Sequence, residues 1–327
     1  MPRLGRLIAQ RSGLVTAQWL RNLVAEGRNI PPTFQIYWNE VRPVGNANRD
    51  WVDVRLNGEY VYTQTGGSGG RIYVSPNNSI SWFTIWDNNI TSGGVLRGHA
   101  DGDLVFFTRT NHTTEAHISQ NFGEDWDVRT LPTSNSGSGK SFVGGNIIHY
   151  GGGSSNNHLY RSTNYGVNWQ SLSDMVSGVA SRNGLNLVGA SSSNLPIRIG
   201  VVVSIIISPD IGKFFTPSFI SDSANTILVW GDNKLYLTLN RGLNWNDVSP
   251  TTGYNYPIST CSESGDIIFT TYNGRLYISR DFGNTYEETQ PIGDTSSSWQ
   301  TLALDQSGET LYVGNNQRLY KGASFYG

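Results

Sequence analysis

Short apolar runs alternate with clusters of Gly, Ser, Asn and Thr along most of the chain. The runs are about four to six residues long, which is typical of strands rather than helices. Many contain β-branched or aromatic residues and end at Ser or Thr, as in RLYIS at residues 275–279. Gly and Asn are poor helix formers and favour tight turns. The pattern therefore predicts an all-β protein built from many short strands.

One of these runs recurs seven times. Successive copies lie about 43 residues apart, except for one interval of about 30 residues. Repeats of about 40–50 residues with four strands each are typical of β-propeller blades. The sequence thus predicts seven antiparallel, four-stranded blades at about residues 50–327. The copies are RIYVS (71–75), EAHIS (115–119), HLYRS (158–162), SIIIS (204–208), KLYLT (234–238), RLYIS (275–279) and RLYKG (318–322).

A turn pattern follows six of the seven copies, as in SQNFGEDW at residues 119–126. Ser and Asn side chains can bond to the backbone of their own turn, Gly accepts a positive φ, and the last aromatic ring can be buried against a neighbour. The pattern resembles the Asp-box, or BNR repeat, S-x-D-x-G-x-x-W, with Asn often in place of Asp. The resemblance implies a turn between the third and fourth strands of each blade. The matching positions are Ser119, Asn121, Gly123, Trp126, Ser162, Asn164, Gly166, Trp169, Asn240, Gly242, Trp245, Ser279, Asp281 and Gly283.

The last repeat ends before a fourth strand, which would leave an unpaired edge. Residues 33–40, TFQIYWNE, have strand character and precede the first repeat. We therefore expect them to pair with residues 318–323 and close the ring. The propeller domain would then span residues 33–327.

Residues 1–32 have a different pattern and are expected to form a separate N-terminal arm. Ser12 can cap a helix, apolar residues follow at helical spacing, and Gly27 with two prolines ends the segment. The helix either packs on its own propeller or docks on another subunit. The candidate docking residues are Trp19, Leu20, Leu23 and Val24.

Composition narrows the range of functions. The 327 residues carry a formal net charge of −2, with charged residues at 15%. This balance gives no electrostatic case for nucleic-acid binding, which requires neutralisation of phosphates. No apolar stretch approaches the roughly 20 residues of a membrane span. The single cysteine, Cys261, excludes an internal disulfide.

No recognisable catalytic set is present. The Asp-box resemblance includes sialidases, but PIRIG at 196–200 and GGRIY at 69–73 lack the Pro of the sialidase arginine motif, and Arg71 recurs as Arg275 and Arg318 in repeat strands. Two carboxylates could hydrolyse a glycoside. The candidate carboxylates are scattered along the chain at Glu40, Asp103, Glu115 and Glu309.

Cofactor and metal motifs are equally weak. GSGKS at 137–141 precedes a strand-like segment rather than the helix of a phosphate loop. His99, Asp101 and Asp103 suggest a metal, but HADGD also suits a hairpin turn. We therefore predict no cofactor and no metal.

Ten tryptophans offer another clue. Those that close the turn pattern have a structural explanation. The others either pack between blades or stack on sugars, and packing is the simpler alternative; they are Trp38, Trp51, Trp86, Trp230 and Trp299.

Three function classes remain. Four lysines, abundant Ser, Asn and Gly, and a separate arm resemble the virion proteins of tailed bacteriophages, which implies a structural protein assembled symmetrically with other virion proteins in a tail, nozzle or collar. The second class is a glycan-binding module, for example for a host-surface glycan, or a glycoside hydrolase. The third is a cytoplasmic assembly factor similar to the photosystem II assembly propeller.

Overall fold

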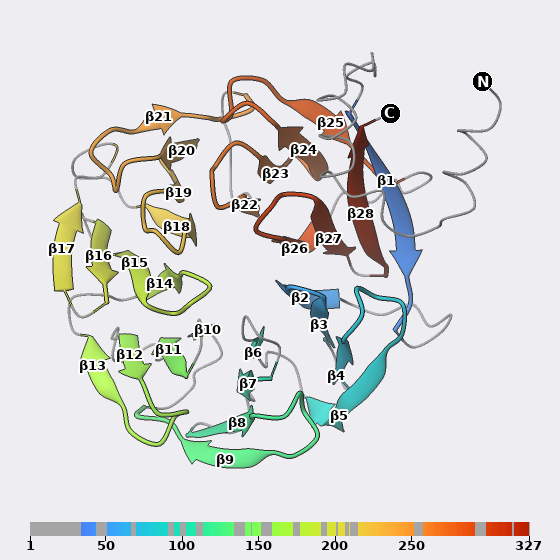
Figure 1. The fold of residues 1–327 in the computed structure, drawn as a ribbon, viewed down its shortest axis with the longest axis vertical. Coiled ribbons are helices and arrows are strands. Elements are labelled where there is room, and N and C mark those ends of the chain that lie inside the picture. The colour runs from blue at the N-terminus through green and yellow to red at the C-terminus, as the bar shows by residue number, and fades with distance from the viewer. Residues whose placement is uncertain are drawn as a thin grey trace, which may run out of the picture.

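Seven four-stranded sheets form a ring around a central axis (Figure 1). A computed structural model describes residues 34–43, 51–66, 70–90, 95–98, 103–108, 114–133, 141–144, 146–151, 159–172, 177–190, 195–200, 202–206, 209, 215–251, 258–291, 299–315 and 317–326. Within these ranges all regular elements are strands. The predicted all-β, seven-bladed propeller with antiparallel four-stranded blades is confirmed.

Blades 1 to 3 follow one another along the chain, each with its first strand nearest the axis. Blade 1 contains β2 (Trp51–Asn57), β3 (Tyr60–Thr65), β4 (Gly70–Ser75) and β5 (Phe83–Ile90). Blade 2 contains β6 (Val95–Gly98), β7 (Val105–Thr108), β8 (Glu115–Ser119) and β9 (Asp127–Thr130). Blade 3 contains β10 (Ser141–Gly144), β11 (Ile147–Gly151), β12 (Leu159–Ser162) and β13 (Gln170–Leu172).

Blades 4 to 6 repeat the same strand order. Blade 4 contains β14 (Ser177–Ala180), β15 (Asn186–Ala190), β16 (Leu195–Ile199) and β17 (Val202–Ile206). Blade 5 contains β18 (Thr216–Ile220), β19 (Ile227–Gly231), β20 (Lys234–Thr238) and β21 (Asn246–Asp247). Blade 6 contains β22 (Ser259–Cys261), β23 (Ile268–Tyr272), β24 (Arg275–Ser279) and β25 (Glu287–Thr289).

Blade 7 combines the two ends of the described chain. Its inner strands are β26 (Trp299–Leu304), β27 (Thr310–Asn315) and β28 (Leu319–Tyr326), and its outer strand is β1 (Phe34–Val41). In Figure 1, blue β1 lies beside dark-red β28. The two strands are antiparallel and pair from Phe34 opposite Tyr326 to Val41 opposite Leu319. This is the strand pairing that the sequence predicted for residues 33–40.

One repeat was assigned wrongly from the sequence. SIIIS at 204–208 was expected to be a third strand, but β17 is the fourth strand of blade 4, and β16 is the third. Gly200, with φ 61°, lies in a very short turn between them. The hairpin of β16 and β17 thus lies within one almost continuous apolar stretch of sequence. The short repeat interval disappears once β16 is used as the third strand of blade 4.

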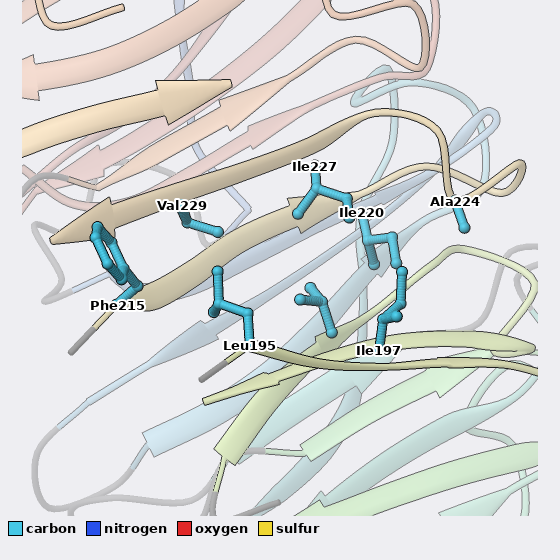
Figure 2. Packing of buried hydrophobic residues seen from close by; sticks show 8 residues of the cluster. Leu195, Ile197, Phe215, Ile220, Ala224, Ile227 and Val229 are labelled. Atoms are coloured by element: carbon cyan, nitrogen blue, oxygen red, sulfur yellow. The ribbon is translucent and has the colours of Figure 1, made fainter. Parts of the chain in front are cut away.

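The hydrophobic core lies between blades. In one cluster, Leu195 and Ile197 of β16 face Phe215, Ile220 and neighbouring apolar residues of blade 5 (Figure 2). Because side chains alternate across a strand, one face of each blade packs on the preceding blade and the other on the following blade. Blades are therefore held by side-chain packing rather than by shared strands.

The tryptophans without a place in the turn pattern belong to this packing. Trp51 and Trp299 are buried, and Trp38, Trp86 and Trp230 are partly buried against core clusters. The Trp38 indole also donates to Thr289 Oγ1 at 3.1 Å, which links β1 to blade 6. Packing between blades, the simpler alternative, accounts for all five.

Candidate functional site: the face that carries the strand turns

Turns between third and fourth strands share one hydrogen-bond pattern in blades 1, 2, 3, 5 and 6. In blade 2 the Ser119 hydroxyl accepts from Gly123 N at 2.8 Å, and Asn121 Oδ1 accepts from Asp125 N at 2.9 Å. The Asn side chain thus does with one oxygen what Asp281 does in blade 6, where Oδ1 accepts from Thr285 N at 2.9 Å. The corresponding starting residues elsewhere are Ser75, Ser162, Thr238 and Ser279.

Two consecutive residues of each such turn have positive φ. In blade 2 they are Phe122 at 59° and Gly123 at 92°. The sequence pattern reveals the second of these positions through its glycine but not the first. The next residue points away from the protein, since it lies at the tip of the turn. At this tip position Ile80, Val167 and Leu243 are 85%, 60% and 79% exposed.

The aromatic residue that closes each turn reaches the preceding blade. Trp126 Nε1 donates to Ile85 O at 3.2 Å, and Trp169 Nε1 donates to Thr130 O at 3.1 Å. Tyr286, which replaces Trp in blade 6, donates its hydroxyl to Val248 O at 2.7 Å. Trp245 packs against the core between blades 4 and 5. The turn therefore also fixes its blade to the one before it.

A second recurrent turn joins the first and second strands of blades 4 to 7, and sequence analysis missed it. Ser181, Ser221 and Ser262 each accept a hydrogen bond from the backbone nitrogen five residues later, at 3.0–3.1 Å. Asp305 takes this place in blade 7, where its carboxylate accepts from Glu309 N at 2.8 Å. The detectable signal was the recurrence of SRNG, SDSA, SESG and DQSG at residues 181, 221, 262 and 305.

The turns between first and second strands (inner turns) lie on the same face of the ring as the turns between third and fourth strands (outer turns). Backbone bonds connect the two sets within a blade, as from Phe122 N to Asp103 O and from Arg241 N to Asn225 O. The face is therefore built almost entirely from two kinds of turn, one near the axis and one near the rim. It carries fewer regular backbone bonds than the strands and offers many side chains to solvent.

The inner turns of blades 4 to 6 each donate a backbone hydrogen bond to the inner turn of the next blade. Asn183 N donates to Asp222 Oδ1 at 2.9 Å, and Asp222 N donates to Glu263 Oε2 at 2.9 Å. Glu263 N in turn donates to Gln306 O at 3.1 Å. Blades 4 to 7 are thus braced to one another near the axis.

Arg182 belongs to the same chain of turns and reaches towards the opposite side of the ring. A Cβ atom on Gly58, in the β2–β3 turn, would lie 3.9 Å from Arg182 Nη2. Burial, followed by the negative charge of Asp222, raises the pKa of Glu263, while Arg182 lowers it. The carboxylates of Asp222 and Glu263 both accept backbone hydrogen bonds and so have a structural role. Glycoside hydrolysis instead requires a pair of carboxylates that can act on a substrate.

The candidate catalytic residues are not brought together. Arg71 on β4 pairs with Asp87 on β5, and Arg275 on β24 pairs with Glu288 on β25. Glu40 pairs with Arg42 at 2.7 Å at the end of β1. Asp103 precedes β7 and Glu115 begins β8, so these two lie at opposite ends of blade 2, and Glu309 lies in blade 7.

Several predicted features lie outside the described residues. They include the arm with Trp19, Leu20, Leu23 and Val24, most of GSGKS, and His99 and Asp101 of HADGD. The strands that flank HADGD, β6 and β7, are paired antiparallel, as a hairpin requires. Ser141–Gly144 after GSGKS is strand β10, not a helix.

No group of three His, Cys, Asp or Glu side chains in the described ranges is arranged to hold a metal ion. No helix within the same ranges is long and apolar enough to cross a membrane.

These features define a seven-bladed propeller whose two sets of turns share one face. No family model and no curated protein sequence matches the chain. Among solved structures, it is similar to YCF48 bound to D1 peptide, with 14% identity over 90% of this chain and 99% of that one, at a TM-score of 0.63. YCF48 from Cyanidioschyzon merolae is also 14% identical, over 87% and 98% of the two chains, at a TM-score of 0.62.

An enzyme shares the fold as well. The GH74 xyloglucanase from Xanthomonas campestris is 12% identical over 88% of this chain and 53% of that chain, at a TM-score of 0.60. At such identities the similarity extends to the fold, and a fold of this kind hosts unrelated functions.

Proposed function

We propose that the chain is a non-enzymatic structural propeller that binds other proteins through the face carrying the two sets of turns. The observation that supports this is the tip position of the outer turns, where Ile80, Val167 and Leu243 are largely exposed. The turn uses the backbone nitrogen of this position, as from Val167 N to Asn164 O, and Glu124 and Asn284 occupy the position in blades 2 and 6. The fold therefore does not require apolar residues there, and contact with a partner explains them.

We further propose that the partners are other virion proteins of a tailed bacteriophage, in a symmetric assembly. In this proposal the arm at residues 1–32 anchors the chain through Trp19, Leu20, Leu23 and Val24, and the rigid propeller is presented outwards. The braced inner turns support a rigid role, because a ring fixed at its axis can present its surface without rearrangement.

Light scattering on the full chain tests the face. The variant I80S/V167S/L243S removes the three exposed tips, and V128S/V202S is the control because Val128 and Val202 are exposed on outer strands of the ring. We expect the full chain to form a defined oligomer that only the tip variant weakens. A monomeric full chain whose scattering neither variant changes would contradict self-assembly through this face.

The arm needs a separate comparison. We expect a chain that starts at residue 31 to remain folded but to lose assembly with other virion proteins. If deletion of the arm leaves assembly unchanged, the arm is a cap on the propeller. Glycan arrays and hydrolase assays then test the second function class, and peptide-binding assays test a role similar to an assembly factor.

A further inference from the structure

Each blade turns one cross-strand pair of side chains towards the following blade, one from its second strand and one from its third. In five blades both members of this pair are apolar and buried. The position is repeated closely enough that the blades can be compared residue by residue. The five apolar pairs are Tyr62 and Val74, Phe106 and Ile118, Val188 and Ile197, Leu228 and Leu237, and Phe269 and Ile278.

Blade 3 breaks this rule with His149 and Arg161, which lie directly opposite each other on β11 and β12. They are only 1% and 8% exposed. His149 Nε2 lies 3.0 Å from Gly184 O, and Arg161 Nη1 donates to Gly200 O at 2.9 Å. Both acceptors belong to blade 4, so the two polar side chains occupy the junction between blades 3 and 4.

Blade 7 also has a polar pair, but its polar groups are engaged. Tyr312 donates its hydroxyl to Ser79 Oγ at 2.8 Å, and Lys321 Nζ donates to Asn78 O at 2.9 Å. In blade 3, by contrast, Arg161 Nε and His149 Nδ1 are buried without a hydrogen-bond partner. Such groups are costly to bury, so something is expected to satisfy them.

The junction is also rich in positive charge. Burial lowers the pKa of Arg161, and the nearby Arg198 of blade 4 lowers it further. Burial is also the main reason that the pKa of His149 is lowered to about 4, with Arg161 and Arg198 contributing. Among the described residues no carboxylate acts on either group to offset these effects. Two guanidinium groups and a neutral imidazole therefore face one another across the junction.

The tautomer of His149 determines which hydrogen-bonding groups a ligand at this junction must have. Gly184 O can only accept, so Nε2 carries the proton and Nδ1 offers a lone pair. A ligand that satisfies both buried groups must accept from Arg161 and donate to His149. A hydrogen phosphate ion does both, because it has oxygen acceptors and a hydroxyl donor.

We propose that the junction between blades 3 and 4 binds free hydrogen phosphate, through Arg161 and Arg198 as donors and His149 as acceptor. Arg198 and Gly200 at this junction are half-buried rather than fully buried. The near-complete burial of Arg161 favours a free ion over a phosphoryl group attached to a larger molecule. The site is independent of the protein-binding function proposed above.

Thermal unfolding and calorimetric titration of the full chain with inorganic phosphate test the site, in Tris chloride at pH 7.5 and constant ionic strength. We expect phosphate at about ten times its Kd to raise the unfolding midpoint by about 2 °C or more. Arg161→Met should abolish this shift. Arg241→Met is the matched control, because Arg241 is an exposed arginine of an outer turn on the same face.

Stability without phosphate separates binding from folding. We expect Arg161→Met to unfold at or above the midpoint of the unsubstituted protein in chloride alone, because it removes a buried cation. If Arg161→Met fails to fold, Arg198→Met takes its place in the titration. A phosphate shift that survives in both variants, or the absence of binding to the unsubstituted protein, would overturn the proposal.

Two further ligands check the remaining details. Sulfate has no hydroxyl at this pH, so it should bind more weakly than phosphate; equal binding would overturn the role of His149. O-phosphoserine should bind less well than the free ion. Tighter binding of O-phosphoserine would overturn the assignment to free phosphate and favour an esterified phosphoryl group.

Discussion

Gly144, at the end of β10 in blade 3, and Gly184, in the inner turn of blade 4, show how closely neighbouring blades approach each other. A Cβ atom on Gly144 would lie 2.0 Å from Gly184 N, a contact that no side chain can make. Gly144 is not one of the described glycines with a positive φ. The need for glycine at this position is therefore purely steric. Neither the turn pattern nor the hydrophobic pattern contains this information, since the contact joins two blades.

Gly144→Ala should therefore destabilise the protein by about 2–3 kcal/mol, through displacement of the backbone at this crossing. Gly200→Ala is the matched control, because Gly200 has a φ of 61° but no atom within 4 Å of its Cβ position. That substitution should cost only about 1 kcal/mol of conformational energy. Urea unfolding of both variants measures the difference. Equal losses would show that the crossing can relax.

The side chains of the outer turn contribute unequally to its stability. The hydroxyl of Ser279 accepts from Gly283 N at 2.8 Å, a bond that an alanine cannot replace. Asp281 accepts from Thr285 N through one oxygen, as Asn does in four other blades. This explains why Asn so often stands in the Asp position of the pattern.

We expect Ser279→Ala to lower the free energy of unfolding by about 1–2 kcal/mol, since the Gly283 nitrogen loses its partner. Asp281→Asn should cost less than about 0.5 kcal/mol at neutral pH. Denaturant unfolding of the two variants gives the comparison. A larger loss for Asp281→Asn would mean that the second carboxylate oxygen, bonded to the Thr285 hydroxyl at 2.6 Å, dominates the turn.

The features that could be predicted from the sequence were those that recur from blade to blade. Strand–turn units with a Ser at the strand end and an aromatic residue seven positions later, such as Ser119 and Trp126, were predictable because the same local sequence pattern recurs in several blades. Blade 4 escaped because its third-to-fourth turn at Gly200 is too short to leave a polar break in the sequence. The contacts of Arg182, Asp222 and Glu263 could not be predicted, because they depend on which turns the ring brings to its axis.

The whole ring depends on one strand from the opposite end of the described chain. β1 pairs with β28 along its full length of 8 residues, and Trp38 extends the contact to blade 6. Without β1, β28 would present an open edge and blade 7 would have three strands. Blade 7 would still contact blade 1, through Tyr312 and Lys321, but with a weakened outer layer.

Two truncations isolate this contribution. A chain that starts at residue 34 keeps β1, whereas a chain that starts at residue 43 lacks it. The shorter chain should unfold at least about 10 °C lower, because it loses a full strand of backbone bonds and the packing of Ile36 and Trp38 on the blade 7 core. Circular dichroism gives the midpoints, and light scattering detects association through the open edge. If both chains melt together as monomers, β1 is dispensable, and the seam between blades 7 and 1 closes the ring without it.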